Sequence, residues 1–429
     1  MFAHRIRAWF SAAPLPRLRR LLLALYVLTA AADAAGKALA ADPVISNAVM
    51  RRLRGASAAE MHEAARPSGN FEIFRTASRH LFEGIDLYAT YPDEHSDRFK
   101  YSPTFALLFA PFAWLPWPLA LFLWSTLNAL VLFAAVEQVL PGRAGLFALF
   151  CLHPEVLRAM QNAQSNALVA ALIVFAFASL ERRRVWRAAA SVVLGASVKI
   201  FPLAALTFAL PRRLALRTGA WAVAVGATLV ALPLLVTSPS RLVEQYASWR
   251  GVESVDAQQR WFSVMELVHR WTGTTLPNWP VQLAGTLLLV APLLLRRDRW
   301  DDSRFRVLYL CSMLLYVVLF NHQAERASYL IAFVGATLWY AGSPRVRWRS
   351  MLYWLAFVTI PVMSTLIPGA ILRTETAMLY RLAVPCLSIW IAVQWELLVR
   401  SDAAATDVSK SNARSTSRFS RELDTESSG

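Results

Sequence analysis

The sequence contains few of the residues that define several common classes of site. Only three cysteines occur in 429 residues, Cys151, Cys311 and Cys386, and each lies inside an apolar stretch. This number and placement indicate neither a disulfide framework nor zinc-finger spacing, so we expect three buried thiols. The sequence also lacks a P-loop and a GxGxxG motif. We therefore do not expect nucleotide-phosphate binding.

Acidic residues and lysines are also scarce. The chain has 28 acidic against 44 basic residues, a net charge of +16, and only four of the basic residues are lysines. In a soluble chain this excess would suggest a nucleic-acid partner. Here the arginine clusters fall between apolar segments, where basic residues determine the orientation of membrane helices. We therefore expect a membrane lipid environment and no nucleic acid.

Apolar residues are abundant. They make up 56% of the chain, the mean hydropathy is +0.40, and runs of membrane-spanning length recur. Because lipid offers no partners to backbone amides, such runs are expected to be helices. The sequence predicts an all-α polytopic integral membrane protein with about 10 to 12 transmembrane helices. Predicted spans lie near 21–40, 117–136, 144–157, 165–181, 218–237, 279–296, 306–320, 327–342, 350–367 and 379–398.

Five basic segments predict the orientation of these spans. They lie near 5–20, 181–187, 211–217, 296–306 and 344–348, and placing all of them inside the cell gives a consistent path with both termini cytoplasmic. The first apolar run is followed by Asp33 and Lys37, so we interpret it as an uncleaved first helix in the inner or plasma membrane. Two external loops are then large, 41–103 and 237–278. Residues 1–400 form the predicted membrane domain, and the polar, serine-rich residues 401–429 a disordered cytoplasmic tail.

Two segments depart from simple spans. Residues 188–210 have arginines at both ends, so we favour a re-entrant hairpin with two arms meeting near Lys199, the alternative being an ordinary span that violates the charge rule. In the first loop, Phe71, Phe74 and Leu81 share one face at helical spacing and Gly84 follows. This pattern predicts an amphipathic helix at the membrane interface.

The stretch PDEHSDRFKYSPTFALLFAPF, from position 92, places titratable groups next to hydrocarbon. A carboxylate at such a boundary can have its pKa raised toward the range of a general base, and Lys100 or Arg98 could hold an anionic phosphate. The alternative is an ordinary solvated loop. Further acids of this first loop are Glu72, Glu83 and Asp86.

Two more polar clusters interrupt the apolar helices. Gln161, Asn162, Gln164, Ser165 and Asn166 form the first; they either bind substrate or join helices through hydrogen bonds. The second lies in NHQAERASY from position 321, which contains His322, Glu325 and Arg326. A proton relay, an anion clamp and a closed ion-pair network are open alternatives there. Separately, Lys199 either reaches a phosphate or carboxylate from within the bundle or extends to the interface.

Taken in order, several motifs resemble those of glycosyltransferase family 87. They are EGIDLY from position 83, KYSPTFALLFAPFAWLP from 100, Trp124 with Asn128, QNAQSNALVAALI from 161, and SVKIFPLAAL from 197. The likeness extends from Asn70 to about Val399. It implies a GT-C-type helical bundle that transfers a sugar, a mannose-like hexose or a pentose, from a polyprenyl-phosphate donor to a lipid or glycan acceptor on the external face, with inversion.

The resemblance also implies roles for single residues. An acid in the first external loop would be the base, but Asn70 stands where the family commonly has Asp. We therefore assign the base to Asp97, then Glu94, then Glu72. For substrate and donor-phosphate binding the candidates are Lys100, Tyr101, Lys199, His322, Glu325, Arg326, Gln161, Asn162, Gln164 and Asn166.

No cofactor is expected to be required, and no ligand cluster indicates a metal, although a divalent ion stays open. Two other functions compete with glycosyl transfer. One is a transporter or flippase of a lipid-linked or anionic solute, which the hairpin at Lys199 suggests. The other is a catalytically altered relative that acts as an assembly partner, which Asn70 suggests.

Overall fold

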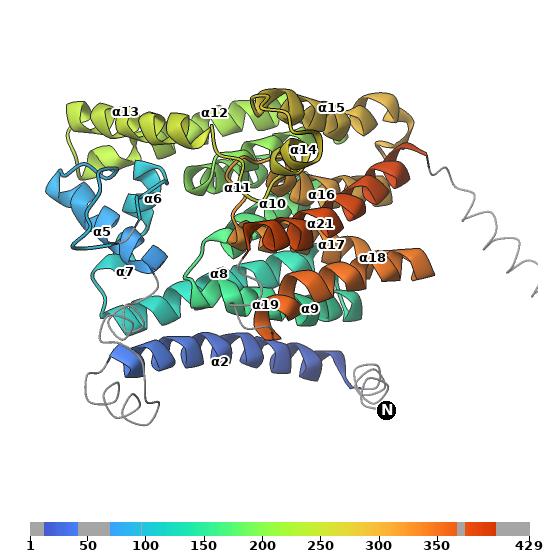
Figure 1. Ribbon diagram of the computed structural model, residues 1–429, viewed down its shortest axis with the longest axis horizontal. Coiled ribbons are helices and arrows are strands. Elements are labelled where there is room, and N and C mark those ends of the chain that lie inside the picture. The colour runs from blue at the N-terminus through green and yellow to red at the C-terminus, as the bar shows by residue number, and fades with distance from the viewer. Residues whose placement is uncertain (1–12, 42–68, 96, 367–373, 400–429) are drawn as a thin grey trace, which may run out of the picture.

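The computed structural model describes residues 13–41, 69–95, 97–366 and 374–399, and all regular elements within them are helical. Figure 1 shows the long helices running roughly side by side, with α5, α6 and α7 gathered at one end of the bundle. The all-α prediction is confirmed for this part of the chain. Residues 42–68 of the predicted first loop and the predicted disordered tail lie outside the described residues.

The helices coincide with the predicted spans. The long ones are α2 Leu15–Ala41, α8 Trp117–Val139, α9 Arg143–Gln161, α10 Asn166–Glu181, α11 Val185–Val198, α12 Ala215–Ala231, α15 Trp279–Leu295, α16 Ser303–Leu319, α17 Tyr329–Ala341, α18 Arg347–Phe357 and α21 Glu375–Leu398. The others are α5 Gly69–Glu83, α6 Pro103–Leu108, α7 Ala110–Ala113, α13 Pro239–Asp256, α14 Val264–Thr272, α19 Met363–Leu366, the 3₁₀ helices η1 Phe201–Ala209, η2 Leu232–Leu235, η3 Arg297–Arg299 and η4 Arg326–Ser328, and the π-helical η5 Val358–Val362.

Four of the described helices are long and apolar enough to cross a membrane: α2, α8, α12 with its continuation to Leu235, and α21. Several others, α10, α11 and α15 among them, are apolar but shorter. A helix needs about 20 residues to cross the hydrocarbon layer. The helical character of each predicted span is therefore established, while the number of 10 to 12 crossings stays a prediction.

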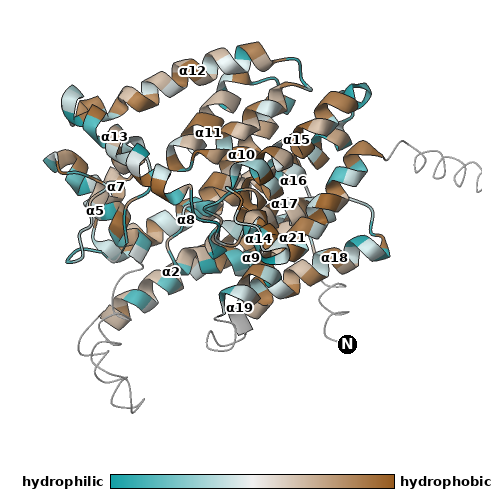
Figure 2. Cartoon of the chain, turned by 45° about the horizontal axis from the view of Figure 1, so that its top comes forward, coloured by the Kyte–Doolittle hydropathy of each residue, from teal (hydrophilic) through white to brown (hydrophobic). Residues whose placement is uncertain are grey.

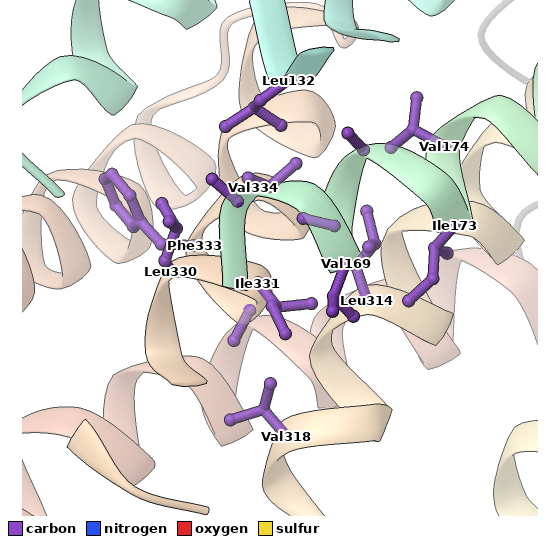
Figure 3. Close-up of a cluster of buried hydrophobic side chains, with 14 of the residues drawn as sticks. Leu132, Val169, Ile173, Val174, Leu314, Val318, Leu330, Ile331, Phe333 and Val334 are labelled. Carbon is purple, nitrogen blue, oxygen red and sulfur yellow. The ribbon is translucent and has the colours of Figure 1, made fainter. Parts of the chain in front are cut away.

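The core lies where α10, α16 and α17 meet. Val169 of α10, Leu314 of α16 and Ile331 of α17 are among the buried residues of this cluster, which Figure 3 shows with Leu132 of α8 beside them. A helix that is apolar on all sides must be covered on all sides. The sequence of α10, NALVAALIVFAFASLE, is apolar on all sides, and the neighbouring helices bury it.

Outward faces of the bundle are also apolar. Leu216 and Val223 of α12 expose 91% and 73% of their surface, and Met351 of α18 exposes 72%. In Figure 2 the long helices are largely brown, whereas teal gathers at loops and helix ends. Large apolar side chains exposed on several helices suit these faces to contact with lipid.

Basic segments from distant parts of the sequence meet at one end of the bundle. They contact the ends of neighbouring helices through hydrogen bonds of 2.5–2.8 Å: Arg19 to Glu137, Arg182 to Gln138, Arg306 to Glu181, Arg296 to the Leu398 carbonyl, and Arg349 to Glu396. These contacts place the described basic segments on a common side, which is the arrangement that the predicted orientation requires.

Two predicted local structures are present. Helix α11 ends before Lys199, which has an extended backbone (φ −144°, ψ 135°), and η1 then folds back against α11. The arms pack so closely that a Cβ on Gly195 would lie 3.1 Å from the Pro202 side chain. In the first loop, α5 is the predicted amphipathic helix, but its apolar face, with Phe71 and Phe74, is buried against the aromatic rings of α6 and α8 and not turned to a membrane interface. The three cysteines are free and buried, as predicted.

Candidate functional site

A cavity of about 440 Å³ opens at the end of the bundle opposite the basic segments. Segments far apart in the sequence line it, among them the loop 97–101 before α6, the break at Lys199, helix α13, and the loop 321–325 between α16 and α17. Apolar side chains of η1 and α16 form one wall, where Phe201 and Val317 contribute, and most of the titratable side chains lie on the other walls. The cavity thus combines a hydrocarbon wall with titratable groups.

The loop before α6 is held between the hairpin and α5. Ser102 is the N-cap of α6, since its Oγ accepts a hydrogen bond from the Phe105 amide at 3.1 Å. The same hydroxyl donates to the Ser197 carbonyl of α11 at 2.5 Å. On the other side, the Tyr101 ring packs edge-on against Phe74 of α5, with centroids 4.9 Å apart. Lys100 and Tyr101 are therefore held near Lys199 on the cavity wall.

Lys100 forms the central ion pair of the cavity. Its Nζ lies 3.1 Å from Asp256 Oδ2, and its carbonyl accepts a hydrogen bond from Trp249 Nε1 at 3.3 Å. Gln323 donates to the same Asp256 carboxylate at 3.2 Å. Burial alone would lower the pKa of the Lys100 ammonium, but attraction to Asp256 outweighs this effect and raises the pKa. Lys100 is therefore a fixed cation.

Lys199 supplies a second cation from the break between α11 and η1. Its side chain lines the cavity, and among the described residues its ammonium has neither an ion pair nor a hydrogen bond. Placing a lysine where the helix has ended lets its side chain turn into the cavity rather than along the helix. An ammonium with three free donors at the end of an apolar wall is suited to binding an anion.

The prediction missed two acids of the cavity, Glu253 and Asp256. With Trp249 they recur at i, i+4 and i+7 on one face of α13, inside the external loop 237–278. Gln323 also donates to Glu253 Oε2, at 3.3 Å. Burial, and then repulsion from Asp256, raise the pKa of the Glu253 carboxyl above its ordinary value. The helical spacing of these three residues was the signal in the sequence that could have revealed them.

The three predicted candidates for the base lie in different places. Asp97 lines the cavity at its rim, exposed, with its Oδ1 accepting a hydrogen bond from the Arg98 amide at 2.7 Å. Glu94 instead faces His80, its Oε2 lying 3.2 Å from Nε2 of that residue. Glu72 is half-buried on α5 and also outside the residues that line the cavity. Of the three, the structure brings only Asp97 to the cavity.

The loop between α16 and α17 places its predicted residues, His322, Glu325 and Arg326, in two different environments. His322 and Glu325 line the cavity. Burial lowers the pKa of the His322 imidazole, and its buried Nε2 has no hydrogen-bond partner. Arg326 turns away from the cavity and pairs with Glu155 of α9 at 2.8 Å, where Glu155 exposes only 1% of its side chain. The Arg326–Glu155 contact is therefore a structural ion pair that joins the loop to α9.

The predicted amides lie at the turn between α9 and α10, outside the residues that line the cavity. Asn166 donates to Gln164 at 3.2 Å, and Asn162 donates to the Arg158 carbonyl at 2.9 Å. The Asn162 carbonyl accepts from Asn70, which does line the cavity, at 3.1 Å. Gln161 is exposed, and its carbonyl accepts from Lys37 at 2.7 Å. These contacts favour the alternative in which the amides join helices.

The chemistry available in the cavity is anion binding next to proton acceptance. Lys100, Lys199 and Arg98 supply positive charge, while Asp97 and Glu253 supply carboxylates that lack an ion pair with a described cation. Among the described residues, no three histidine, cysteine or acidic side chains gather into a metal-binding group. The site therefore has the groups for displacing an anionic leaving group with a hydroxyl nucleophile.

Comparison with protein-family models identifies a family for this chain. The model of glycosyltransferase family 87 matches residues 99–321. The matched region is shorter than the stretch from Asn70 to Val399 over which the motifs are similar. It contains most of the segments that line the cavity, including Lys100, Lys199 and α13. A search of curated proteins found no match.

Proposed function

The chain belongs to glycosyltransferase family 87, and we propose that it transfers a mannose-like hexose or a pentose from a polyprenyl-phosphate donor to a lipid or glycan acceptor. A membrane glycosyltransferase is what the family and the apolar helices support. We place the reaction on the external face of the cell membrane, with both termini in the cytoplasm, because the cavity lies at the end opposite the basic segments.

The observation that carries this proposal is the composition of the cavity wall. Phe201, Leu203 and Val317 form an apolar side next to Lys199 and Lys100. A polyprenyl phosphate has the same order of groups, a hydrocarbon chain that ends in a phosphate. Leu203 exposes 44% of its surface, so the apolar wall continues to the outside of the bundle, where a lipid would arrive laterally. The wall thus matches a lipid-phosphate donor better than a soluble one.

In the proposed reaction, the acceptor hydroxyl attacks the anomeric carbon from the face opposite the phosphate. The new carbon–oxygen bond forms as the bond to the phosphate oxygen breaks, and the phosphate leaves with the electron pair. This single displacement inverts the anomeric configuration. Asp97 takes the hydroxyl proton at the rim, where an acceptor can approach it. Lys199 and Lys100 stabilise the charge that develops on the departing phosphate.

Two further side chains would orient the substrates. The His322 Nε2, buried at the cavity wall without a partner, is placed to hydrogen-bond the donor phosphate or the acceptor. Glu325 lines the same wall and could accept a hydrogen bond from a sugar hydroxyl. In this mechanism the donor brings its own leaving group, so no cofactor is required.

The test uses purified protein in lipid, radiolabelled polyprenyl-phosphate sugars and a membrane-lipid extract. We expect labelled product from the wild type and a rate lower by about 10²- to 10⁴-fold in Asp97→Asn, which removes the base. The matched control is Asp93→Asn, because Asp93 is exposed in the same loop but does not line the cavity. His322→Ala should lower the rate as well.

Product from none of the donors would contradict the proposed activity. Full activity in Asp97→Asn would instead remove Asp97 as the base and leave the transfer itself standing. The external face has its own test, in which a cysteine introduced at Asp93 is labelled by an impermeant reagent in intact cells. Protection of that cysteine would overturn the proposed orientation.

A further inference from the structure

A second cavity, of about 390 Å³, lies at the basic end of the bundle between α8, α10 and α11. Its polar side is formed by Arg182, Arg184 and Arg187, which come from the turn between α10 and α11 and from the first turn of α11. Leu172 and Phe175 of α10 and Leu194 of α11 form its apolar walls. The reaction proposed above uses none of these residues.

The charge around this cavity is one-sided. No carboxylate lines it, and within the described residues none of its three arginines has an ion pair. The acid nearest in sequence, Glu181, is engaged elsewhere, since it accepts hydrogen bonds from Arg306 at 2.7 and 2.8 Å. In the part of the chain that the structure describes, the side-chain partner of Arg182 is the neutral Gln138, at 2.8 Å. Three guanidinium groups without a counter-charge are suited to an anion with several acceptor oxygens, such as a phosphate.

The walls indicate which kind of molecule bears that phosphate. Leu172, Phe175 and Leu194 continue the cavity along α10 and α11, toward the middle of the bundle. Beside the arginines, Trp186 exposes 53% of its surface, and the Arg187 guanidinium lies 5.3 Å from its ring centroid. Exposed tryptophan next to arginine at the end of apolar helices is typical of the headgroup region of a membrane. A soluble anion would leave the apolar walls unused.

We propose that this cavity binds the phosphate headgroup of an anionic phospholipid on the cytoplasmic side, with an acyl chain along α10 and α11. Basic pockets between helices on that side bind such headgroups in general. The site is separate from the reaction cavity, so the proposal is independent of the donor and acceptor proposed above. The hairpin that carries Lys199 begins at this site, because α11 runs from Val185 to Val198. A bound lipid would therefore stabilise the arm that positions Lys199.

The experiment measures lipid retention by native mass spectrometry and melting temperature in nanodiscs of phosphatidylcholine with or without phosphatidylglycerol. We expect phosphatidylglycerol to be retained by the wild type and to raise its melting temperature. In the double variant Arg184→Gln/Arg187→Gln, binding should weaken by roughly 30-fold, from about 1 kcal/mol per removed charge, and the temperature shift should disappear. The control is Arg183→Gln, because Arg183 lies in the same turn but does not line the cavity.

Three outcomes would overturn the proposal. One is equal retention of phosphatidylcholine and phosphatidylglycerol by the wild type. Another is an equal loss of binding in Arg183→Gln, which would indicate a diffuse attraction to surface charge. The third is that inorganic phosphate stabilises the protein as much as the lipid does, which would indicate a site for the free anion. If the double variant does not fold, Arg187→Gln alone gives the same comparison with a smaller expected loss.

Discussion

Replacing Gly285 by alanine should distort the reaction cavity through Phe320, one of the residues that line it. Gly285 lies on α15, and a Cβ at this position would be 2.2 Å from Cδ1 and 2.6 Å from Cγ of Phe320. Carbon atoms in contact are normally about 3.5–4.0 Å apart, so the ring or the helix must move by more than an ångström. Phe320 lines the cavity, so the displacement reaches the site directly.

The surroundings of Phe320 prevent an inexpensive adjustment. Its ring stacks on Tyr316 with centroids 5.3 Å apart and packs against Trp390 at 5.0 Å. Its carbonyl accepts a hydrogen bond from Gln282, one turn before Gly285 on α15, at 3.3 Å. Extra volume in such a packed region typically costs about 1–3 kcal/mol of stability. Misplacing substrate-contacting groups by about 1 Å can lower a rate by roughly 100-fold.

The assay compares melting temperature and sugar-transfer rate of Gly285→Ala with those of Gly226→Ala. In α12 the same change places the Cβ 3.7 Å from Val193, an ordinary contact, so Gly226→Ala should behave like the wild type. Adding Phe320→Leu to Gly285→Ala should restore part of the stability, because the smaller side chain provides the missing space. Equal behaviour of the two alanine variants, or no recovery with Phe320→Leu, would refute the reasoning.

The remaining predictions concern single polar contacts. Glu155→Gln replaces the carboxylate 2.8 Å from the Arg326 guanidinium by a neutral amide, so the charge of Arg326 is no longer balanced. We expect a loss of about 3–5 kcal/mol of folding stability, seen as a lower melting temperature. A loss no larger than that of an exposed acid-to-amide change would contradict this expectation. Burial and a neighbouring carboxylate raise the pKa of Glu253, so on acidification it takes up a proton earlier than an ordinary carboxyl and the cavity loses a negative charge. The KM for an anionic donor should therefore fall as the pH is lowered through that pKa, and Glu253→Gln should abolish this dependence; a collapse of kcat in the variant would instead make Glu253 the base. Ser102→Ala removes the N-cap of α6 and should cost about 0.5–2 kcal/mol in thermal unfolding, whereas no change would show that the cap is replaced by other contacts.

Much of the helical framework follows from local sequence. Apolar runs of sufficient length become helices because their backbone amides have no other partners in lipid, and each predicted span falls on a helix. The sequence also favoured the break at Lys199, because arginines flank a segment whose simple crossing would violate the charge rule and Pro202 follows shortly after. Positions of this kind depend on neighbours within a few residues, so periodicity and charge reveal them.

The composition of the reaction cavity could be predicted only in part. Lys100, Lys199 and His322 were recognised individually as polar groups next to apolar segments, and the structure brings them to one cavity. Glu94 and Arg326 had the same local appearance, but the first faces His80 and the second pairs with Glu155. A polar residue beside hydrocarbon has two ways to satisfy its charge, a ligand or a protein partner, and the local sequence does not distinguish them.

The sequence by itself determined that this chain is an all-helical protein suited to a membrane, that its basic segments share one side, and that it resembles a glycosyltransferase family. Each of these properties depends on composition and spacing along the chain. Only the tertiary structure decided that Asp256 of α13 pairs with Lys100, more than 150 residues earlier, and that Glu253 lies beside them. Contacts between distant segments depend on how helices pack, and packing is a property of complementary surfaces rather than of any single segment.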